Sequence, residues 1–329
     1  MRSARLIMTL VIALTGVVSG RRAAAENPDA AVTLPNLRMP TLGGKQFWAD
    51  VWLLDRYRIQ RNAVTGNYRL LDPVNKRQAW GTLEACRDTL ATLQTRRNIE
   101  PTRGKVVLVM HGLFRTRASM ERLCRYLREH SDYEVINLSY PSTRGTVGEH
   151  AQALASVVES LEGAEEINFV AHSLGNLVIR HWLGDLAAAG EEPPPSLSRI
   201  VMLGPPNQQP ELALKLVPMD VSGRVAGPAA QQLATGWEAL APQLAVPQNE
   251  FAILAGGRND ELRNNPFVRG DDDWVVSVAS TRLPGAADFR VVPVGHTFMM
   301  NDPFVQKYVL QFLQHGYFET EQTTQPILD

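Results

Sequence analysis

The middle of the chain alternates between unbroken apolar runs and amphipathic stretches. The apolar runs are typical of strands buried on both faces, and they cover residues 105–110, 133–138, 167–171 and 199–203. The amphipathic stretches predict helices over residues 119–130, 149–161 and 177–189. Two later strands and a closing helix are predicted at residues 251–255, 289–294 and 302–315. This alternation predicts an α/β fold with a mostly parallel central sheet and helices on both faces.

The segment before the first of these strands follows another pattern. Residues 26–46 are rich in proline, glycine and small side chains and form a lead-in. Two strand-like runs joined by the turn signal Thr65-Gly66-Asn67 predict a hairpin over residues 57–72. Apolar residues at helical spacing then predict a helix over residues 82–97, with Thr82 as its N-cap.

Residues 207–247 break the alternation a second time. The segment is rich in proline and holds two amphipathic patches, which are Leu212, Leu214, Leu216 and Leu233, Trp237, Leu240. A segment of this kind after the carboxyl end of a strand is either a lid over a site or an insertion packed for stability. The sequence leaves both interpretations open.

Composition favours an ordinary globular protein. The chain has 329 residues, of which 44% are apolar, and this is enough for a sizeable core. We expect one domain with insertions. The 33 basic and 34 acidic residues leave a net charge of -1, and no long basic run occurs, so a nucleic-acid partner is not expected.

The N-terminus resembles a targeting signal. A basic start is followed by the apolar residues 6–20, which are short for a membrane span of roughly 20 residues. Ala23-Ala24-Ala25 offers a cleavage site, so residues 1–25 are predicted to be a signal peptide of an exported, periplasmic or secreted protein. Arg21 and Arg22 interrupt this pattern. Cleavage after Gly20 and an uncleaved anchor, with peripheral membrane contact, therefore stay open as alternatives.

The two cysteines, Cys86 and Cys124, are either a disulfide or two buried thiols on different helices. Neither cysteine has metal-ligand spacing, and the seven histidines form no H-E-x-x-H pattern. We therefore expect no metal and no cofactor.

Ser173 is the candidate nucleophile. It directly follows an apolar strand, directly precedes a helix, and has Ala171 and Gly175 two positions to either side. A nucleophile elbow needs this context, because the sharp turn from strand to helix tolerates only small flanking residues. The backbone N–H of Leu174 and that of Leu113, in the His-Gly loop after the first parallel strand, are the candidate oxyanion donors.

A nucleophilic serine needs a base, and the base needs an orienting acid. His296 follows the last predicted strand and comes last in chain order, which favours it as the base. The other histidines lie beside the serine, in the His-Gly loop, or in and at the ends of helices. Asp273 borders an apolar run and is the preferred acid, while Asp271, Asp272 and, as an outside choice, Asp260 stay open.

These residues resemble the α/β-hydrolase superfamily, and within it small bacterial lipases and esterases. The shared marks lie between Lys105 and Gly316, and they are His111-Gly112, Ala171-His172-Ser173-Leu174-Gly175, Leu203-Gly204-Pro205-Pro206-Asn207, Asp273 before Val275-Val276, and Val294-Gly295-His296. Ala171 in place of glycine and Trp274 after the acid depart from the pattern. The resemblance allows residues 48–97 to be the antiparallel strands with which this fold commonly begins.

The resemblance implies a serine hydrolase acting on small-molecule or lipid esters through an acyl-enzyme. An acyltransferase, thioesterase or amidase using the same triad stays an alternative, and the oligomeric state is open. The implied organisation is a signal peptide (1–25), an N-terminal extension (26–104), a catalytic domain (105–316) and a tail (317–329).

Overall fold

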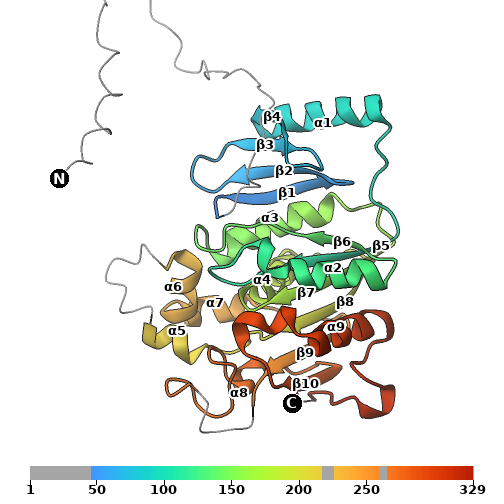
Figure 1. Ribbon diagram of the computed structural model, residues 1–329. Coiled ribbons are helices and arrows are strands. Elements are labelled where there is room, and N and C mark those ends of the chain that lie inside the picture. The colour runs from blue at the N-terminus through green and yellow to red at the C-terminus, as the bar shows by residue number, and fades with distance from the viewer. Residues whose placement is uncertain (1–45, 217–225, 259–264, 329) are drawn as a thin grey trace, which may run out of the picture. The chain divides into compact units, whose positions relative to one another are not determined.

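A parallel sheet whose two faces are both covered forms the centre of the fold. The computed structural model describes residues 46–216, 226–258 and 265–328, all within one compact unit (Figure 1). The parallel strands are, in spatial order, β10 (Asp288–Val292), β9 (Phe251–Gly256), β8 (Leu197–Leu203), β7 (Glu166–His172), β5 (Lys105–Met110) and β6 (Glu134–Asn137). Each neighbouring pair is parallel, which confirms the predicted fold class.

Alternate side chains of these strands enter two separate cores. Successive side chains of a strand point to opposite faces, so Leu108 joins one core and Val109 the other. The first core is shared with α3 (Val147–Glu159) and α4 (Leu174–Ala189). The second is shared with α2 (Glu121–His130) and α9 (Pro303–His315). The continuous apolar runs of the sequence are thereby explained.

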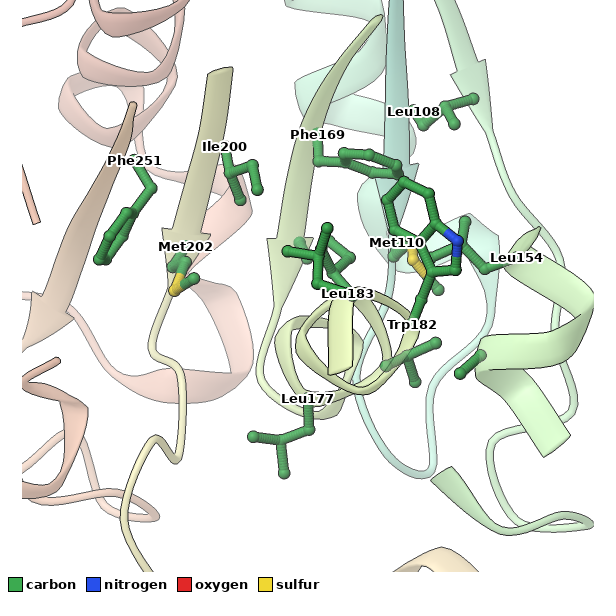
Figure 2. Close-up of a cluster of buried hydrophobic side chains, with 14 of the residues drawn as sticks. Leu108, Met110, Leu154, Phe169, Leu177, Trp182, Leu183, Ile200, Met202 and Phe251 are labelled. Carbon is green, nitrogen blue, oxygen red and sulfur yellow. The ribbon is translucent and has the colours of Figure 1, made fainter. Parts of the chain in front are cut away.

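Figure 2 shows the first core, where α4 packs against the sheet. The rings of Phe169 on β7 and Trp182 on α4 are tilted at a centroid distance of 5.7 Å. Full burial of a side chain of this size contributes roughly 1.5–3 kcal/mol. Helix α4 follows Ser173 directly, so this packing also fixes the backbone on the helical side of the candidate nucleophile.

The N-terminal strands form a sheet of their own. The sheet is antiparallel and consists of β1 (Trp48–Leu54), β2 (Tyr57–Asn62), β3 (Tyr68–Leu71) and β4 (Arg77–Gly81). The predicted hairpin is β2–β3, and the predicted helix is α1 (Leu83–Arg97), whose N-cap Thr82 accepts a hydrogen bond from Ala85 N. These strands are antiparallel, as the resemblance allowed, and they form a sheet separate from the parallel one. They pack with α1 around a third core, to which the strands of the parallel sheet do not contribute.

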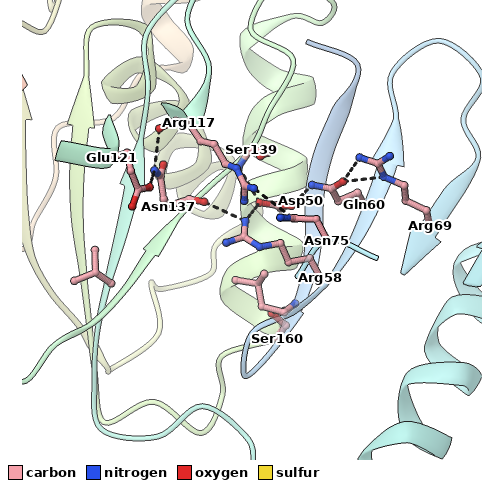
Figure 3. Close-up of polar contacts among 12 residues, drawn as sticks. Asp50, Arg58, Gln60, Arg69, Asn75, Arg117, Glu121, Asn137, Ser139 and Ser160 are labelled. Atoms are coloured by element: carbon pink, nitrogen blue, oxygen red, sulfur yellow. Dashed lines mark hydrogen bonds and ion pairs between the residues drawn. The ribbon is translucent and has the colours of Figure 1, made fainter. Parts of the chain in front are cut away.

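A buried polar network joins the two sheets (Figure 3). We call Asp50, Arg58, Gln60 and Arg69 the inter-sheet network. Asp50 accepts hydrogen bonds from Arg58 (2.7 Å), Gln60 (2.7 Å) and, across to the end of β6, Ser139 N (2.8 Å). Gln60 Oε1 in turn accepts two bonds from Arg69, at 2.7 and 2.9 Å. The network holds β1 against the loop that follows β6.

Short helices follow β8 and β9. They are α5 (Glu211–Leu216), α6 (Pro228–Ala234), α7 (Trp237–Leu240) and α8 (Val278–Thr281). Short 3-10 helices are η1 (Arg117–Met120), η3 (Ala241–Gln243), η5 (His296–Asn301) and η6 (Glu321–Thr323). The predicted signal peptide lies outside the described residues. No helix in the described part of the chain is long and apolar enough to cross a bilayer.

Both cysteines are free and buried, Cys86 in α1 and Cys124 in α2. The alternative of a disulfide is therefore wrong, and the alternative of two thiols on different helices is confirmed. Burial raises the pKa of Cys86 to about 11 and that of Cys124 to about 12, so both stay protonated at neutral pH.

Candidate active site

The strand-to-helix turn at Ser173 has the geometry of a nucleophile elbow. Ser173 is held at φ 52° and ψ -120°, a backbone conformation that non-glycine residues rarely adopt. Its N–H donates to the Leu203 carbonyl at 2.9 Å, which fixes the turn against β8. A Cβ atom on Gly175 would lie 3.0 Å from the His111 carbonyl oxygen and 3.3 Å from Ala171 Cβ. The small residues on both sides are therefore required by close packing.

His296 and Asp273 form a buried pair beside this turn. His296 Nδ1 lies 2.6 Å from Asp273 Oδ2, and the two residues are 7% and 1% exposed. The other carboxylate oxygen accepts the N–H groups of Val275 (3.0 Å) and Val276 (2.7 Å). His296 N also donates to the Asp273 carbonyl at 2.9 Å. Because an ionised carboxylate only accepts, Nδ1 carries the proton and Nε2 is left as the basic nitrogen.

The neighbouring aspartates have other partners. Asp272 accepts the N–H groups of Asn265 (2.9 Å) and Trp274 (2.6 Å), and Asp271 accepts that of Arg258 (2.7 Å). Asp260 lies outside the described residues. Of the described candidates, Asp273 is the one that contacts His296. The apolar run beside it supplies the two N–H donors that orient it.

The His-Gly loop lies against the serine. A Cβ atom on Gly112 would come within 3.1 Å of Ser173 Cβ and 2.9 Å of His172 Nδ1, so only glycine fits there. Neither the N–H of Leu113 nor that of Leu174 donates a hydrogen bond to another described residue. Two unpaired amides beside one serine are the arrangement that an oxyanion hole needs. Phe114, at φ 57°, turns the loop just beyond the first amide.

Ser173 and His296 share a mainly apolar cavity of about 420 Å³. No hydrogen bond between the Ser173 hydroxyl and the His296 ring is present among the described residues, and such bonds often tighten only when substrate binds. Residues of the loop after β5, of the segment after β8 and of the loops around Val275 and His296 line the cavity: Leu113, Phe114, Arg115, His172, Ser173, Pro206, Pro210, Leu212, Ala213, Ala230, Leu233, Val275, Val276, His296 and Thr297.

The cavity lining includes residues of two short helices in the proline-rich segment. Leu212 and Ala213 come from α5, and Ala230 and Leu233 come from α6. These residues line the same cavity as Ser173 with apolar side chains. That residues 207–247 act as a lid over the site stays a prediction.

Sequence reasoning missed the part that His172 plays in the geometry. Its Nε2 lies 3.0 Å from the His296 carbonyl oxygen, and the two rings are 4.6 Å apart. A carbonyl only accepts, so Nε2 donates and Nδ1, which is buried without a partner among the described residues, is unprotonated. Burial, and then the nearby His296, lower the pKa of His172 well below 6.5. A polar residue at the end of an apolar strand was the available signal.

Tyr140 was also missed. Its hydroxyl donates to the His111 carbonyl, and its ring stacks on His111 at 4.3 Å. The same carbonyl abuts Gly175, so Tyr140 supports the contact between the His-Gly loop and the elbow. No local pattern marks Tyr140, because it reaches the loop from the strand end after β6.

No group of three or more His, Cys, Asp or Glu side chains that could hold a metal ion occurs among the described residues.

Comparison with known proteins finds one matching family model and several solved structures of similar fold. A family described as a domain of unknown function (DUF7379) matches residues 73–217, which includes the His-Gly loop and the elbow. No curated protein matches the chain.

The similar solved structures include bacterial lipases and esterases. The lipase BlEst2 of Bacillus licheniformis, in its mature form, is 19% identical with a TM-score of 0.46, covering 64% of this chain and 89% of that one. The phospholipase PlaB of Legionella pneumophila is 17% identical with a TM-score of 0.48, covering 68% and 61%. A lipase-esterase related protein of Clostridium acetobutylicum is 13% identical with a TM-score of 0.42, covering 64% and 93%. These likenesses concern the fold.

Proposed function

We propose that the chain is a serine hydrolase that cleaves carboxylic esters, with Ser173 as nucleophile, His296 as base and Asp273 as orienting acid. The observation that carries the proposal is the buried His296–Asp273 pair at 2.6 Å, which opens onto the same cavity as the strained Ser173. Each part has a physical purpose in acyl transfer, and together they follow the order nucleophile, acid, histidine along the chain.

The first half of the reaction forms an acyl-enzyme. Ser173 Oγ attacks the ester carbonyl carbon while His296 Nε2 takes the hydroxyl proton. The carbonyl oxygen becomes an oxyanion and accepts the N–H groups of Leu113 and Leu174. The C–O bond to the alcohol then breaks, and the alcohol leaves with the proton from His296.

The second half of the reaction releases the acid and regenerates the free enzyme. Water attacks the acyl carbon, His296 takes one proton from it, and the bond to Ser173 Oγ breaks as Oγ regains that proton. Asp273 stabilises the imidazolium in both halves without becoming protonated. An alcohol acceptor in place of water would make the same site an acyltransferase.

The test is ester hydrolysis combined with active-site labelling. Wild-type protein, Ser173→Ala and the control Ser156→Ala, a serine on α3, are assayed on p-nitrophenyl esters from acetate to palmitate and exposed to a fluorophosphonate. Wild type and the control should turn over and take up the label, and Ser173→Ala should do neither. Wild type without label and without turnover overturns the proposal. Turnover that requires an added alcohol replaces the hydrolase with an acyltransferase.

The signal pattern of residues 1–25 supports a second part of the proposal, export from the cytoplasm. Fractionation of cells that express the full chain tests it. Recovery of the protein with the cytoplasmic fraction, at full length, would contradict export.

A further inference from the structure

The cavity beside Ser173 is mainly apolar but contains one permanent charge. Arg115 lines it, and no aspartate or glutamate does among the described residues. The two histidines of the lining are His172, whose pKa burial lowers well below 6.5, and His296, which pairs with Asp273. Among the described residues that line the cavity, Arg115 therefore supplies the one permanent positive charge that a ligand would meet.

Arg115 differs from the other partly buried arginines because its guanidinium has no partner among the described residues. Its guanidinium makes no hydrogen bond or ion pair with any described residue. By contrast, Arg58 is paired with Asp50 at 2.7 Å, and Arg180 donates to the Ala245 carbonyl at 2.9 Å. A guanidinium has five N–H donors, and no described residue accepts a hydrogen bond from that of Arg115. These donors are therefore available to an anionic ligand.

The backbone of Arg115 is held firmly, so the side chain is presented from a fixed point. Its N–H donates to the Gly112 carbonyl at 3.2 Å, and its carbonyl accepts Gln46 Nε2 at 2.8 Å. Gln46 is held in turn by Thr143 Oγ1 at 3.2 Å. Because the same turn contains Gly112, it also positions the candidate oxyanion amide of Leu113 relative to Arg115. The charge is therefore carried by a loop that lines the same cavity as Ser173.

We infer that Arg115 selects esters that carry a negatively charged group, a phosphate or a carboxylate, close to the scissile bond. The guanidinium donates hydrogen bonds to that group while the acyl chain lies against Leu212, Ala230 and Leu233. This inference rests on the proposed function, since it names the substrate class of the same site. It makes Arg115 a specificity-determining residue outside the triad and the oxyanion hole.

The test compares three esters with the same octanoyl chain. They are neutral monooctanoylglycerol, its phosphate counterpart octanoyl lysophosphatidic acid, and the octanoyl ester of lactate, which carries a carboxylate. Release of octanoate is measured below the aggregation concentration of each ester. Wild type should show a kcat/KM for at least one anionic ester that is roughly 10- to 100-fold higher than for the neutral one, as expected for charge-assisted hydrogen bonds. Whichever anionic ester is favoured identifies the source of the charge.

Variants separate the charge from the fold. Arg115→Gln should remove most of the anionic-to-neutral preference, and Arg115→Lys should restore part of it because the charge returns without the planar fork. Arg125→Gln, an exposed arginine on α2, is the matched control and should keep the wild-type ratio. Equal kcat/KM for all three esters in wild type, or an unchanged anionic-to-neutral ratio in Arg115→Gln, overturns the inference about Arg115. If Ser173 still takes up the fluorophosphonate label in that case, the proposed hydrolase function is retained. Absence of both label and turnover overturns the hydrolase and this inference together.

Discussion

Two buried polar clusters in this chain use similar side chains but are satisfied to different extents. In the inter-sheet network, both carboxylate oxygens of Asp50 accept hydrogen bonds, and Gln60 passes the contact on to Arg69 (Figure 3). At the candidate active site, the Asp273 carboxylate is equally well bonded. Other polar groups at this site have no hydrogen-bond partner among the described residues.

Several hydrogen-bond donors at the candidate active site have no partner among the described residues. The N–H groups of Leu113 and Leu174 and the guanidinium of Arg115 have no hydrogen-bond partner among the described residues, and Ser173 has a strained backbone conformation. A purely structural cluster gains nothing from unpaired donors, because each costs desolvation energy. On the proposed function, the inter-sheet network stabilises the fold, whereas the candidate site keeps its donors for a substrate. Removing the same carboxylate charge from each cluster should therefore have opposite consequences.

The largest expected effect is on catalysis. Asp273→Asn should lower kcat by roughly 10⁴-fold, because the amide favours the wrong tautomer of His296, and this equals about 5 kcal/mol on the barrier. The free energy of unfolding should change much less, since the amide oxygen can still accept from Val275 and Val276. Steady-state ester hydrolysis and urea unfolding measure the two quantities. The control Asp271→Asn should keep most of the activity, and an equal loss in both variants would contradict the assignment.

The second effect is on stability. Asp50→Asn removes the charge that pairs with Arg58 in a place where the aspartate side chain is 1% exposed and the arginine side chain 17%. Breaking a buried pair costs about 3–5 kcal/mol, and we expect about 3 kcal/mol here because Arg58 is partly solvated. Asp55→Asn, an exposed aspartate at the β1–β2 turn, is the control. The folded fraction of Asp50→Asn should retain the wild-type kcat. A loss of kcat with an unchanged free energy of unfolding would contradict a purely structural role for the inter-sheet network.

A third effect concerns pH. Burial lowers the pKa of His111 and of His150 to about 4, from an ordinary value of 6.5. Between these values the two histidines bind protons in the unfolded chain but not in the folded chain, so their contribution lowers stability as pH drops from 6.5 toward 4 and is constant below. The thermal midpoint should decrease over this window. His150→Phe should flatten the decrease, and the exposed His130→Gln should not; parallel slopes in all three proteins would count against burial as the cause.

The smallest effect tests strain beside the acid. Trp274 is 53% exposed and sits at φ 81°, a left-handed conformation suited to glycine. Trp274→Gly should be more stable than Trp274→Ala by about 1 kcal/mol, since alanine keeps the strain that glycine relieves. Thermal unfolding of the two variants gives the difference. An alanine variant as stable as the glycine variant would show that the backbone here carries no strain.

The departure at Trp274 illustrates how far local patterns reach. The family pattern often has glycine after the acid, and the φ of 81° supplies the reason, because the chain must turn there for Asp273 to face His296. A pattern can report that glycine is missing. It cannot report that tryptophan adopts the same conformation.

The choice among Asp271, Asp272 and Asp273 shows the same limit. Three consecutive carboxylates differ only by the direction in which each points, and that direction depends on which backbone amides reach it. The apolar neighbours of Asp273 indicated an enclosed position, which its 1% exposure confirms. The 2.6 Å contact with His296 could be found only in the folded chain, because 22 residues separate the two positions.

The strands of the central sheet, the helices between them and the elbow at Ser173 follow from the sequence alone, because apolar runs, helical spacing and small flanking residues are local properties. Tertiary structure decided the rest. It made β1–β4 a separate sheet, since strand partners are chosen by packing across distant segments, and it left the two cysteines apart on separate helices. It also placed His172 against His296 and left the Arg115 guanidinium, at the cavity, without a partner in the described part of the chain. Those arrangements depend on contacts between residues far apart in the chain, and no local pattern encodes them.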